Sequence, residues 1–270
     1  METITSRKNA LVRRAADLSR AQARKEAGAF LCEGARLCAD AAESGLNIRE
    51  AFFTEKAQEK YAPYVQAIQK RAAASYEISE PVAALLSDTK ASQGVYCVCD
   101  LPAAPPLLRL LERPAKGHGL CLERIQDPAN LGTVLRTAEA LGVETLLLCG
   151  EGCDPFSPKA LRGGMGAAFR LRLYHLPSLA EAAPQLRKAG WRLLAAVPDA
   201  DAEPIVALDF SRPTLLAVGN EGAGLLPASI AACDGRVTIP MRGRAESLNA
   251  SASAAILLWE MMREGAEHDG

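Results

Sequence analysis

The chain has 270 residues, enough for one large or two small domains. Its formal net charge at pH 7 is −1, so if the protein binds nucleic acid, its basic residues must gather in a local patch. Its eight cysteines include no Cys-x-x-Cys pair and it has only three histidines, which argues against a zinc site. No signal-like apolar run opens the sequence and no apolar stretch reaches the roughly 18 residues of a membrane span, so we expect a cytoplasmic protein with neither membrane nor metal.

The first hundred residues alternate helix-like and strand-like segments, which predicts a small α/β domain at residues 1–100 with its own core. The predicted helices lie at residues 9–18, 33–44, 56–71 and 81–86, and the predicted strands at residues 29–32, 48–54, 75–78 and 94–99. A run of cations near the start is a candidate basic patch: Arg7, Lys8, Arg13, Arg14, Arg20, Arg24 and Lys25. The solvated face of a helix explains the same run.

A Pro-rich segment that begins at Leu101 breaks this alternation and predicts an extended linker over residues 101–116. The alternation then resumes in a second predicted domain, residues 117–270. Its strands are predicted at residues 120–123, 145–149, 171–175, 191–196, 214–218 and 236–239, and its helices at 130–141, 157–161, 179–189, 227–231 and 247–263. Apolar strands that alternate with helices predict a mainly parallel sheet covered on both faces, whose ligands lie beyond the carboxyl ends of the strands.

The segment Glu123–Glu139 combines a strand end, a turn marked by Pro128 and an amphipathic helix. Asn130, at the start of this helix, is explained as a cap. Arg136, opposite the apolar stripe, is explained as a solvent-facing cation that pairs with Glu139. Both residues are also candidates for a site, because they follow the carboxyl end of a predicted strand.

The segment Leu215–Leu225 is an apolar run that breaks into a Gly-rich turn. Gly219 has no Cβ to hinder a close backbone approach, and Gly222 and Gly224 permit a positive φ. We expect this turn to present backbone N–H and C=O groups to a ligand, although a plain tight turn with Glu221 in solvent explains the same pattern. Its spacing differs from the dinucleotide fingerprint, which argues against a nucleotide-dependent oxidoreductase.

The segment Ile239–Met262 predicts a strand that ends at Pro240, a polar loop, and a helix that opens with Ser247 and Asn249. The apolar residues of this helix cover nearly every direction, which predicts a buried helix. Ser247 and Asn249 are therefore expected at the edge of a core, either as helix caps or as site residues.

Taken together, the three segments resemble the motifs of the SpoU/TrmH branch of the SPOUT superfamily, whose members are RNA 2′-O-ribose methyltransferases. The matching residues are Asn130-x-Gly132-x-x-x-Arg136, then Gly219-Asn-Glu-Gly222-x-Gly224-Leu225, and then Ile239-Pro-Met241 with Ser247-Leu-Asn249. The stretch Arg162–Arg170 is also similar to the family, with Gly163 and Gly164 in place of its usual small residues. The N-terminal pattern from Ser6 to Gly34 resembles the family's substrate-binding domain, which is related to the ribosomal L30e/L7Ae fold.

This resemblance implies a C-terminal SPOUT domain with a trefoil knot, a homodimer, and methyl transfer from S-adenosyl-L-methionine to a ribose 2′-hydroxyl of structured RNA. It implies a catalytic set made of Arg136, Asn130, Glu221, Ser247 and Asn249. It implies a cofactor pocket around Gly219, Gly224, Leu225, Ile239, Met241 and Leu248. RNA contacts are expected at Arg7, Lys8, Arg13, Arg14, Arg162 and Arg170, for which surface solvation is the alternative.

Arg136 is expected to be the central catalytic residue, held by neighbours such as Asn130 and Glu221. A guanidinium stays protonated, so Arg136 is better suited to hold the target phosphate and stabilise a developing alkoxide than to act as a general base. The separate N-terminal domain favours 23S ribosomal RNA as the substrate. Transfer RNA, and a non-catalytic RNA-binding role on the same fold, are the alternatives.

Overall fold

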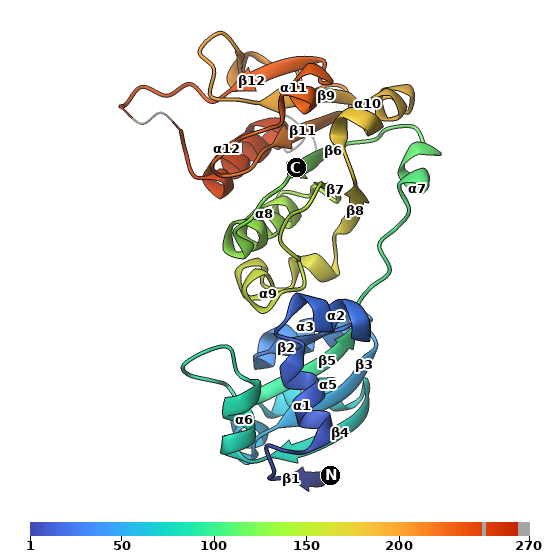
Figure 1. Cartoon of the computed structure of the whole chain (residues 1–270), viewed down its shortest axis with the longest axis vertical. Helices are drawn as coiled ribbons and strands as arrows, with labels where there is room; N and C mark the ends of the chain where they lie inside the picture. Colours follow the sequence, from blue (N-terminus) through green and yellow to red (C-terminus); the bar gives the residue numbers. More distant parts are fainter. Residues whose placement is uncertain (245–246, 264–270) are drawn as a thin grey trace. The chain divides into compact units, whose positions relative to one another are not determined.

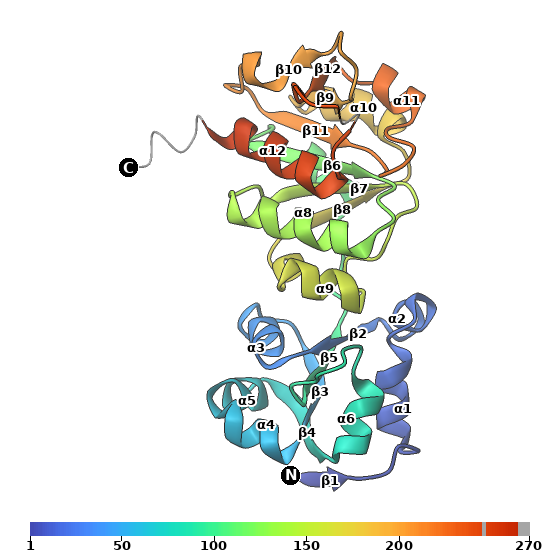
Figure 2. The same cartoon turned by 90° about the vertical axis from the view of Figure 1, so that its left-hand side faces the viewer.

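The computed structural model describes residues 1–244 and 247–263 (Figures 1 and 2). The chain divides into two compact units. The first consists of Met1–Ala103 with Asp154–Phe169, and the second consists of Ala104–Cys153 with the described residues from Arg170 onward. Residues 154–169, which the sequence analysis assigns to the second predicted domain, therefore group with the N-terminal residues.

The first unit is built on a five-stranded sheet in the order β1-β4-β3-β5-β2, in which β1, β4 and β3 are parallel and β5 is antiparallel to both of its neighbours. Its strands are β1 (Glu2–Ile4), β2 (Ala29–Glu33), β3 (Ile48–Phe53), β4 (Ala72–Ile78) and β5 (Val95–Asp100). Its helices are α1 (Ala10–Asp17), α2 (Ala21–Ala27), α3 (Ala35–Glu43), α4 (Glu55–Lys60), α5 (Ala62–Gln69), α6 (Glu80–Leu86) and α9 (Pro158–Gly164). The predicted α/β class is confirmed for this part of the chain, although β1 and α2 were not predicted.

Local signals explain where two helices of the first unit begin. The Oδ1 atom of Asn9 accepts a hydrogen bond from the backbone N–H of Leu11 at 2.8 Å, so Asn9 caps α1 as its residue type predicts. The single helix predicted at residues 56–71 is wrong, because the chain forms α4 and α5 with a break at Tyr61. Pro63 has no N–H to donate to a carbonyl one turn earlier, so it stands in the first turn of a new helix.

The segment inserted from the second half of the chain is held on the first unit by a largely buried ion pair and by aromatic packing. The side chain of Arg24, only 3% exposed, pairs with Asp154 at 2.7 Å and donates hydrogen bonds to two backbone carbonyls between α1 and α2. The rings of Phe156 and Phe169 pack against Phe30 with centroids 5.0 and 5.8 Å away. Arg24 was part of the candidate basic patch, and its burial removes it from the surface available to RNA.

We expect Arg24→Ala to lower the free energy of unfolding of the first unit by about 3 kcal/mol or more, because the change leaves the Oδ2 atom of Asp154 and two backbone carbonyls without the guanidinium that donates to them. The exposed pair of Arg20 and Asp17, with side chains 69% and 57% exposed, provides a control. Arg20→Ala should cost about 1 kcal/mol or less. Urea unfolding with hydrogen exchange of the β2 amides measures both losses, and equal losses would contradict this role for Arg24.

The second unit is built on a seven-stranded sheet in the order β10-β12-β9-β11-β6-β7-β8, in which every pairing is parallel. Its strands are β6 (His118–Glu123), β7 (Thr145–Cys149), β8 (Arg172–Leu176), β9 (Arg192–Ala196), β10 (Glu203–Pro204), β11 (Thr214–Val218) and β12 (Gly235–Thr238). Its helices are α7 (Leu107–Leu111), α8 (Pro128–Ala140), α10 (Leu179–Lys188), α11 (Pro227–Ala231) and α12 (Ala250–Arg263). The predicted mainly parallel sheet is confirmed, while the trefoil knot stays a prediction.

Helices cover both faces of this sheet. α8 and α12 pack against each other on one face, and α10 and α7 lie on the other (Figure 1). The predicted extended linker contains α7, because Leu107 lies one turn before Leu110 and Leu111 and all three pack against the core of the second unit. Among the described residues, no helix has both the length and the apolar character that crossing a bilayer requires.

The last helix departs from its prediction in two ways. α12 begins at Ala250 rather than at Ser247. It is also not buried on every side, since Ile256 and Trp259 are 42% and 58% exposed, while Leu258 is fully buried. One face of α12 packs against the rest of the second unit, and the other presents apolar side chains to solvent. The helical wheel shows that apolar residues lie on all sides, but it does not show which side faces the core.

Candidate active site

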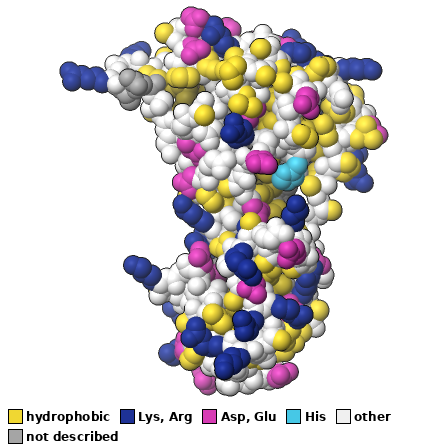
Figure 3. All heavy atoms as spheres, in the orientation of Figure 1, with side chains coloured by type: hydrophobic (Ala, Val, Ile, Leu, Met, Phe, Trp, Pro, Cys, Tyr) yellow, Lys and Arg dark blue, Asp and Glu magenta, His cyan; other side chains and the backbone are white. Residues whose placement is uncertain are grey.

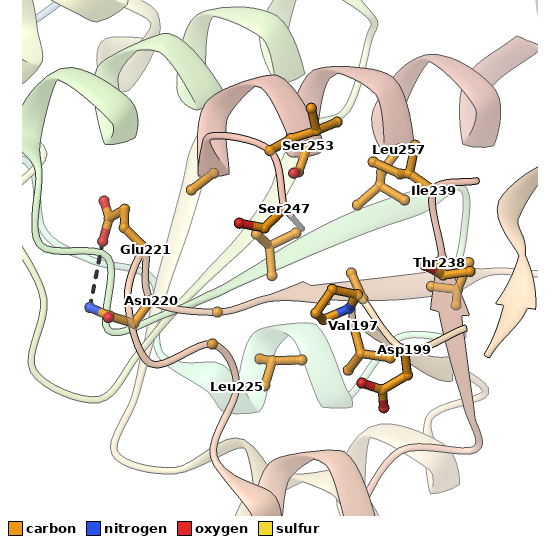
Figure 4. Close-up of a pocket in the computed structure, with 18 of the residues that line it drawn as sticks. Val197, Asp199, Asn220, Glu221, Leu225, Thr238, Ile239, Ser247, Ser253 and Leu257 are labelled. Atoms are coloured by element: carbon orange, nitrogen blue, oxygen red, sulfur yellow. Dashed lines mark hydrogen bonds between the residues drawn. The ribbon is translucent and has the colours of Figure 1, made fainter. Parts of the chain in front are cut away.

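A pocket of about 460 Å³ lies in the second unit, beyond the carboxyl ends of β9, β11 and β12 (Figure 4). Its lining residues fall within four stretches of the chain: residues 196–199, 218–230, 237–241 and 247–257. In Figure 4 the side chain of Ser247 lies among apolar side chains such as Val197, Leu225 and Leu257, while Glu221 lies at the edge of the pocket beside Asn220 with its carboxylate turned away. The volume and the mixed lining suit a small organic ligand held by a few polar groups.

The Gly-rich turn after β11 is closed on itself. The backbone N–H of Asn220 donates to the carbonyl of Gly224 at 3.1 Å, and the reverse bond measures 2.9 Å. A Cβ on Gly219 would lie 2.2 Å from the backbone carbon of Gly224 and from the nitrogen of Leu225, so only glycine fits there. Gly224 has a positive φ of +67°, which glycine permits. Gly222 does not need this freedom, because the Asn220 side chain accepts its N–H and closes the turn without a positive φ.

Three segments that are distant in the sequence meet through side-chain hydrogen bonds beside the pocket. The carboxylate of Glu221 accepts from the Nδ2 atom of Asn130 at 3.0 Å, and the Oδ1 atom of Asn130 accepts from the Nδ2 atom of Asn249 at 3.1 Å. Glu221 also accepts from the backbone N–H groups of Gln126 and Asp127, each at 3.1 Å. The Oδ1 atom of Asn249 caps the first turn of α12. The three motifs therefore form one polar network.

The surroundings of Glu221 favour its ionised form. Burial, the largest influence, raises the pKa of this carboxyl, but hydrogen bonds from the Asn130 side chain and from the backbone of Glu221, Gln126 and Asp127 lower it. The net pKa lies below the ordinary 4.5. Only the ionised carboxylate accepts all of these bonds, because protonation turns one acceptor into a donor. The network is therefore intact at neutral pH.

We expect Glu221→Gln to destabilise the second unit by an amount that depends on pH. Because the pKa of Glu221 is lower in the folded protein than in the unfolded chain, its ionised carboxylate stabilises the fold above pH 4.5. This contribution to stability is lost as the pH falls toward and through the folded pKa. The difference in unfolding free energy between wild type and variant should be constant at neutral pH and should shrink in acid below pH 4.5. Urea unfolding across that range measures it, and a difference independent of pH would contradict the assignment.

A family model described as the SpoU rRNA Methylase family matches residues 118–259, which contain the pocket and the whole polar network. The chain belongs to the SpoU rRNA methylase family. A second model, the MRM3-like substrate binding domain, matches residues 9–97. The two matches share no residue, and the first of them includes the segment 154–169 that groups with the N-terminal unit.

Relatives that are named as RNA methyltransferases match the chain over nearly its full length. An uncharacterized tRNA/rRNA methyltransferase of Synechocystis is 35% identical, over 97% of this chain and 94% of its own. A 23S rRNA (uridine(2479)-2′-O)-methyltransferase of Streptomyces viridochromogenes is 31% identical, over 97% and 92%. The crystal structure of an AdoMet-bound rRNA methyltransferase from Sinorhizobium meliloti has a TM-score of 0.86 at 28% identity, covering 97% of this chain and 98% of that one.

Most of the predicted catalytic and cofactor-binding residues lie together, and all six predicted cofactor-binding residues line the pocket. The following predicted residues line the pocket: Gly219, Glu221, Gly224, Leu225, Ile239, Met241, Ser247 and Leu248. Asn130 and Asn249 lie outside its lining but belong to the hydrogen-bonded network. The sequence could not separate the capping role of Asn249 from a site role, and the structure gives this residue both a cap and a bond to Asn130.

Among the described residues, Arg136 is the predicted catalytic residue that neither lines the pocket nor joins the polar network. It is exposed on α8, and within residues 1–244 and 247–263 it forms no hydrogen bond or ion pair. The expected contacts with Asn130 and Glu221 are therefore absent from the described chain. Six helical positions separate Arg136 from Asn130, which places it about 9 Å farther along α8 and on another side of the helix. Its catalytic role stays a prediction.

The predicted RNA-contacting cations divide into two groups. Arg7, Lys8, Arg13 and Arg14 are exposed, and Arg14 is within 3.9 Å of the carboxylate of Glu50. On the face that Figure 3 shows, Lys and Arg side chains are interspersed with acidic ones. Arg162 is paired with Asp88 at 2.7 Å, and Arg170 is paired with Glu139, the residue that the sequence offered as a partner of Arg136. An RNA phosphate would therefore have to compete with a carboxylate at the second group.

Sequence reasoning missed two parts of the site. Residues 196–199, at the carboxyl end of β9, form one wall of the pocket, and Asp199 there is paired with Arg236 at 2.9 Å. The position of Asp199 after a predicted parallel strand was the available signal. Asn220 was quoted only within the Gly-rich motif, although its side chain holds the turn by accepting from Gly222 and Ala223 and donating to a backbone carbonyl after β6.

Proposed function

We propose that this SpoU family member transfers the methyl group of S-adenosylmethionine to a ribose 2′-hydroxyl of 23S ribosomal RNA. The observation that carries the proposal is the meeting of the three motifs in one polar network, in which Asn130 joins Glu221 and Asn249 beside a pocket that the second and third motifs line. The near-full-length similarity to a 23S rRNA 2′-O-methyltransferase and to an AdoMet-bound rRNA methyltransferase supports the same reaction and cofactor.

The pocket suits S-adenosylmethionine in size and chemistry. Its apolar walls can accept an adenine ring, and the backbone around Gly219, Ile239 and Leu248 offers hydrogen-bonding groups to its edges. The absent side chain at Gly219 leaves the turn close enough to β11 to form this wall. The bound cofactor supplies a methyl group on a sulfonium, which moves to the ribose 2′-oxygen when the two are held in line.

The protein must also manage the proton and the charge of the 2′-hydroxyl. Arg136 keeps its proton at all relevant pH values, so we assign it the role of holding a target phosphate and stabilising the developing alkoxide. The hydroxyl proton then passes to a water or to a phosphate oxygen. Glu221 is engaged by Asn130 and two backbone N–H groups, which suits it to orienting the network rather than to accepting this proton.

We propose that the protein acts as a homodimer and that Arg136 serves the pocket of the partner subunit. Arg136 is exposed on α8, the helix against which α12 packs, and it does not line the pocket of its own chain. The apolar pair Ile256 and Trp259 on α12 provides a surface for a second copy. A cytoplasmic location for the dimer remains part of the proposal, as does RNA binding by the first unit.

Trp259→Glu is expected to convert the dimer to a monomer, because a carboxylate would be buried without a partner at the centre of the apolar contact. Tyr64→Glu provides a control, since Tyr64 is a comparably exposed aromatic residue in the first unit. Light scattering coupled to gel filtration gives the mass of each variant. A dimeric Trp259→Glu variant, or a monomeric wild type, would contradict the proposed interface.

The reaction is tested with purified protein, S-adenosylmethionine, and unmethylated transcripts of 23S ribosomal RNA and of transfer RNA. We expect one 2′-O-methylated nucleotide in the ribosomal transcript, detected by resistance of the adjoining linkage to alkaline cleavage. Methylation of the transfer RNA alone would contradict the proposed ribosomal RNA substrate and would support the proposed reaction. RNA binding without methylation of either transcript would instead favour the non-catalytic role.

A further inference from the structure

Glu123, the last residue of β6, carries a buried carboxylate that the reaction does not use. The residue is 2% exposed and does not line the pocket. Its carboxylate accepts a hydrogen bond from the backbone N–H of Leu226 at 2.7 Å and another from the Oγ atom of Ser229. A buried carboxylate costs stability unless such bonds compensate it, so its two partners define what this side chain does.

The two partners of Glu123 flank the pocket wall in the sequence. Leu226 directly follows Leu225, and Ser229 directly precedes Ile230, and both Leu225 and Ile230 line the pocket. Leu226 also caps α11 without any side-chain capping bond of its own. The carboxylate therefore fixes the backbone at the two points from which these apolar side chains enter the pocket.

A second carboxylate holds the opposite flank of the same turn. Glu221 lies inside the Gly-rich turn and accepts from the backbone N–H groups of Gln126 and Asp127, just after β6. Glu123 lies at the end of β6 and accepts from Leu226, just after the turn. The turn from Gly219 to Leu225 is thus attached on both sides to one short segment, residues 123–127.

We propose that Glu123 is a positioning residue for the cofactor, which it serves by holding Leu226 and Ser229 so that Leu225 and Ile230 form the pocket wall. This inference rests on the proposed function, because it takes S-adenosylmethionine as the ligand. Glu123 touches neither the cofactor nor the RNA in this role. Its loss should therefore weaken cofactor binding and leave turnover at saturating cofactor nearly unchanged.

The test compares variants that keep or remove the two hydrogen bonds. Glu123→Met removes both acceptors at similar size and should raise the dissociation constant of S-adenosylmethionine about tenfold or more, the effect of losing a hydrogen bond to a charged group. Ser229→Ala removes one bond and should give an intermediate rise. Glu123→Gln can still accept from Leu226 and can donate to Ser229, so its dissociation constant should stay within about threefold of wild type.

Thr214→Val is the matched control for general destabilisation. Thr214 is fully buried at the start of β11, far along the strand from Gly219, and its hydroxyl donates to the carbonyl of Arg212 and accepts from Arg192. Calorimetric titration of S-adenosylmethionine onto each full-length variant, together with kcat at saturating cofactor, separates binding from turnover. The control should lose thermal stability and keep its cofactor affinity.

The possible outcomes separate this proposal from the proposed function. Wild-type affinity in both Glu123→Met and Ser229→Ala would overturn the positioning role, as would an equal loss of affinity in Thr214→Val. If Glu123→Met does not fold, Ser229→Ala and Glu123→Gln decide the question by the same comparison. A wild-type protein that does not bind S-adenosylmethionine would contradict the proposed function itself, and the positioning role with it.

Discussion

Arg136→Ala is expected to lower kcat by about 10²-fold or more, because the guanidinium is assigned to the charge that develops on the 2′-oxygen. The dissociation constant of S-adenosylmethionine should change little, since Arg136 does not line the pocket. Stability should also stay within about 0.5 kcal/mol, because the side chain is exposed and makes no hydrogen bond or ion pair with the described residues. Single-turnover methyl transfer at saturating cofactor measures the effect, and wild-type turnover in this variant would refute the assignment.

Mixed dimers show which pocket Arg136 serves. A subunit with Arg136→Ala keeps its pocket, while a subunit with Gly219→Ala keeps its arginine. If Arg136 acts across the dimer, a one-to-one mixture should regain about a quarter of wild-type activity, because half of the dimers then contain one complete site. If Arg136 acts within its own subunit, no complete site can form and the mixture should stay inactive.

Gly219→Ala is expected to weaken cofactor binding strongly. The new Cβ would lie 2.2 Å from two backbone atoms of Gly224 and Leu225, a distance that a side-chain rotation cannot relieve. The turn must then open, which breaks the paired backbone bonds between Asn220 and Gly224 that shape the pocket wall. We expect the dissociation constant of S-adenosylmethionine to rise about 10²-fold or more, as for the loss of several contacts together.

Gly222→Ala is the matched control within the same turn. A Cβ on Gly222 would meet only the Oδ1 atom of Asn220, at 3.7 Å, which is an ordinary contact, and Gly222 has no positive φ. Its cofactor affinity should stay within about threefold of wild type. Calorimetric titration compares the two variants, and a Gly219→Ala protein that binds as well as Gly222→Ala would show that the turn is not part of the cofactor pocket.

The sequence predicted best those features that depend on local pattern. β7, β11 and α11 have the bounds that the sequence predicts. The apolar composition of the two short buried strands and the turns that flank all three elements mark these bounds. The meeting of Asn130, Glu221 and Asn249 followed from a general rule, since the carboxyl ends of parallel strands share one edge of a sheet. The restriction to glycine at position 219 was likewise expected from its place after an apolar strand.

The features that the sequence did not reveal depend on contacts between distant residues. Nothing local marks Arg24 as buried, because its partner Asp154 is 130 positions away. The exposure of Trp259 depends on which side of α12 packs against α8, and an apolar pattern around the whole helix does not encode that choice. Arg136 lies away from the pocket because of the geometry of α8 and because of where the pocket forms. The sequence motif alone does not contain the position of the pocket, so it could not predict this separation.

A crystal structure of the full-length protein with S-adenosylmethionine would show where the cofactor and Arg136 lie. We expect the cofactor between the Gly219–Leu225 turn and the Ile239–Leu248 region, with the guanidinium of Arg136 from the partner subunit facing the methyl group. A cofactor bound elsewhere, or an Arg136 distant from the methyl group in every subunit of the assembly, would contradict the proposed methyltransferase site.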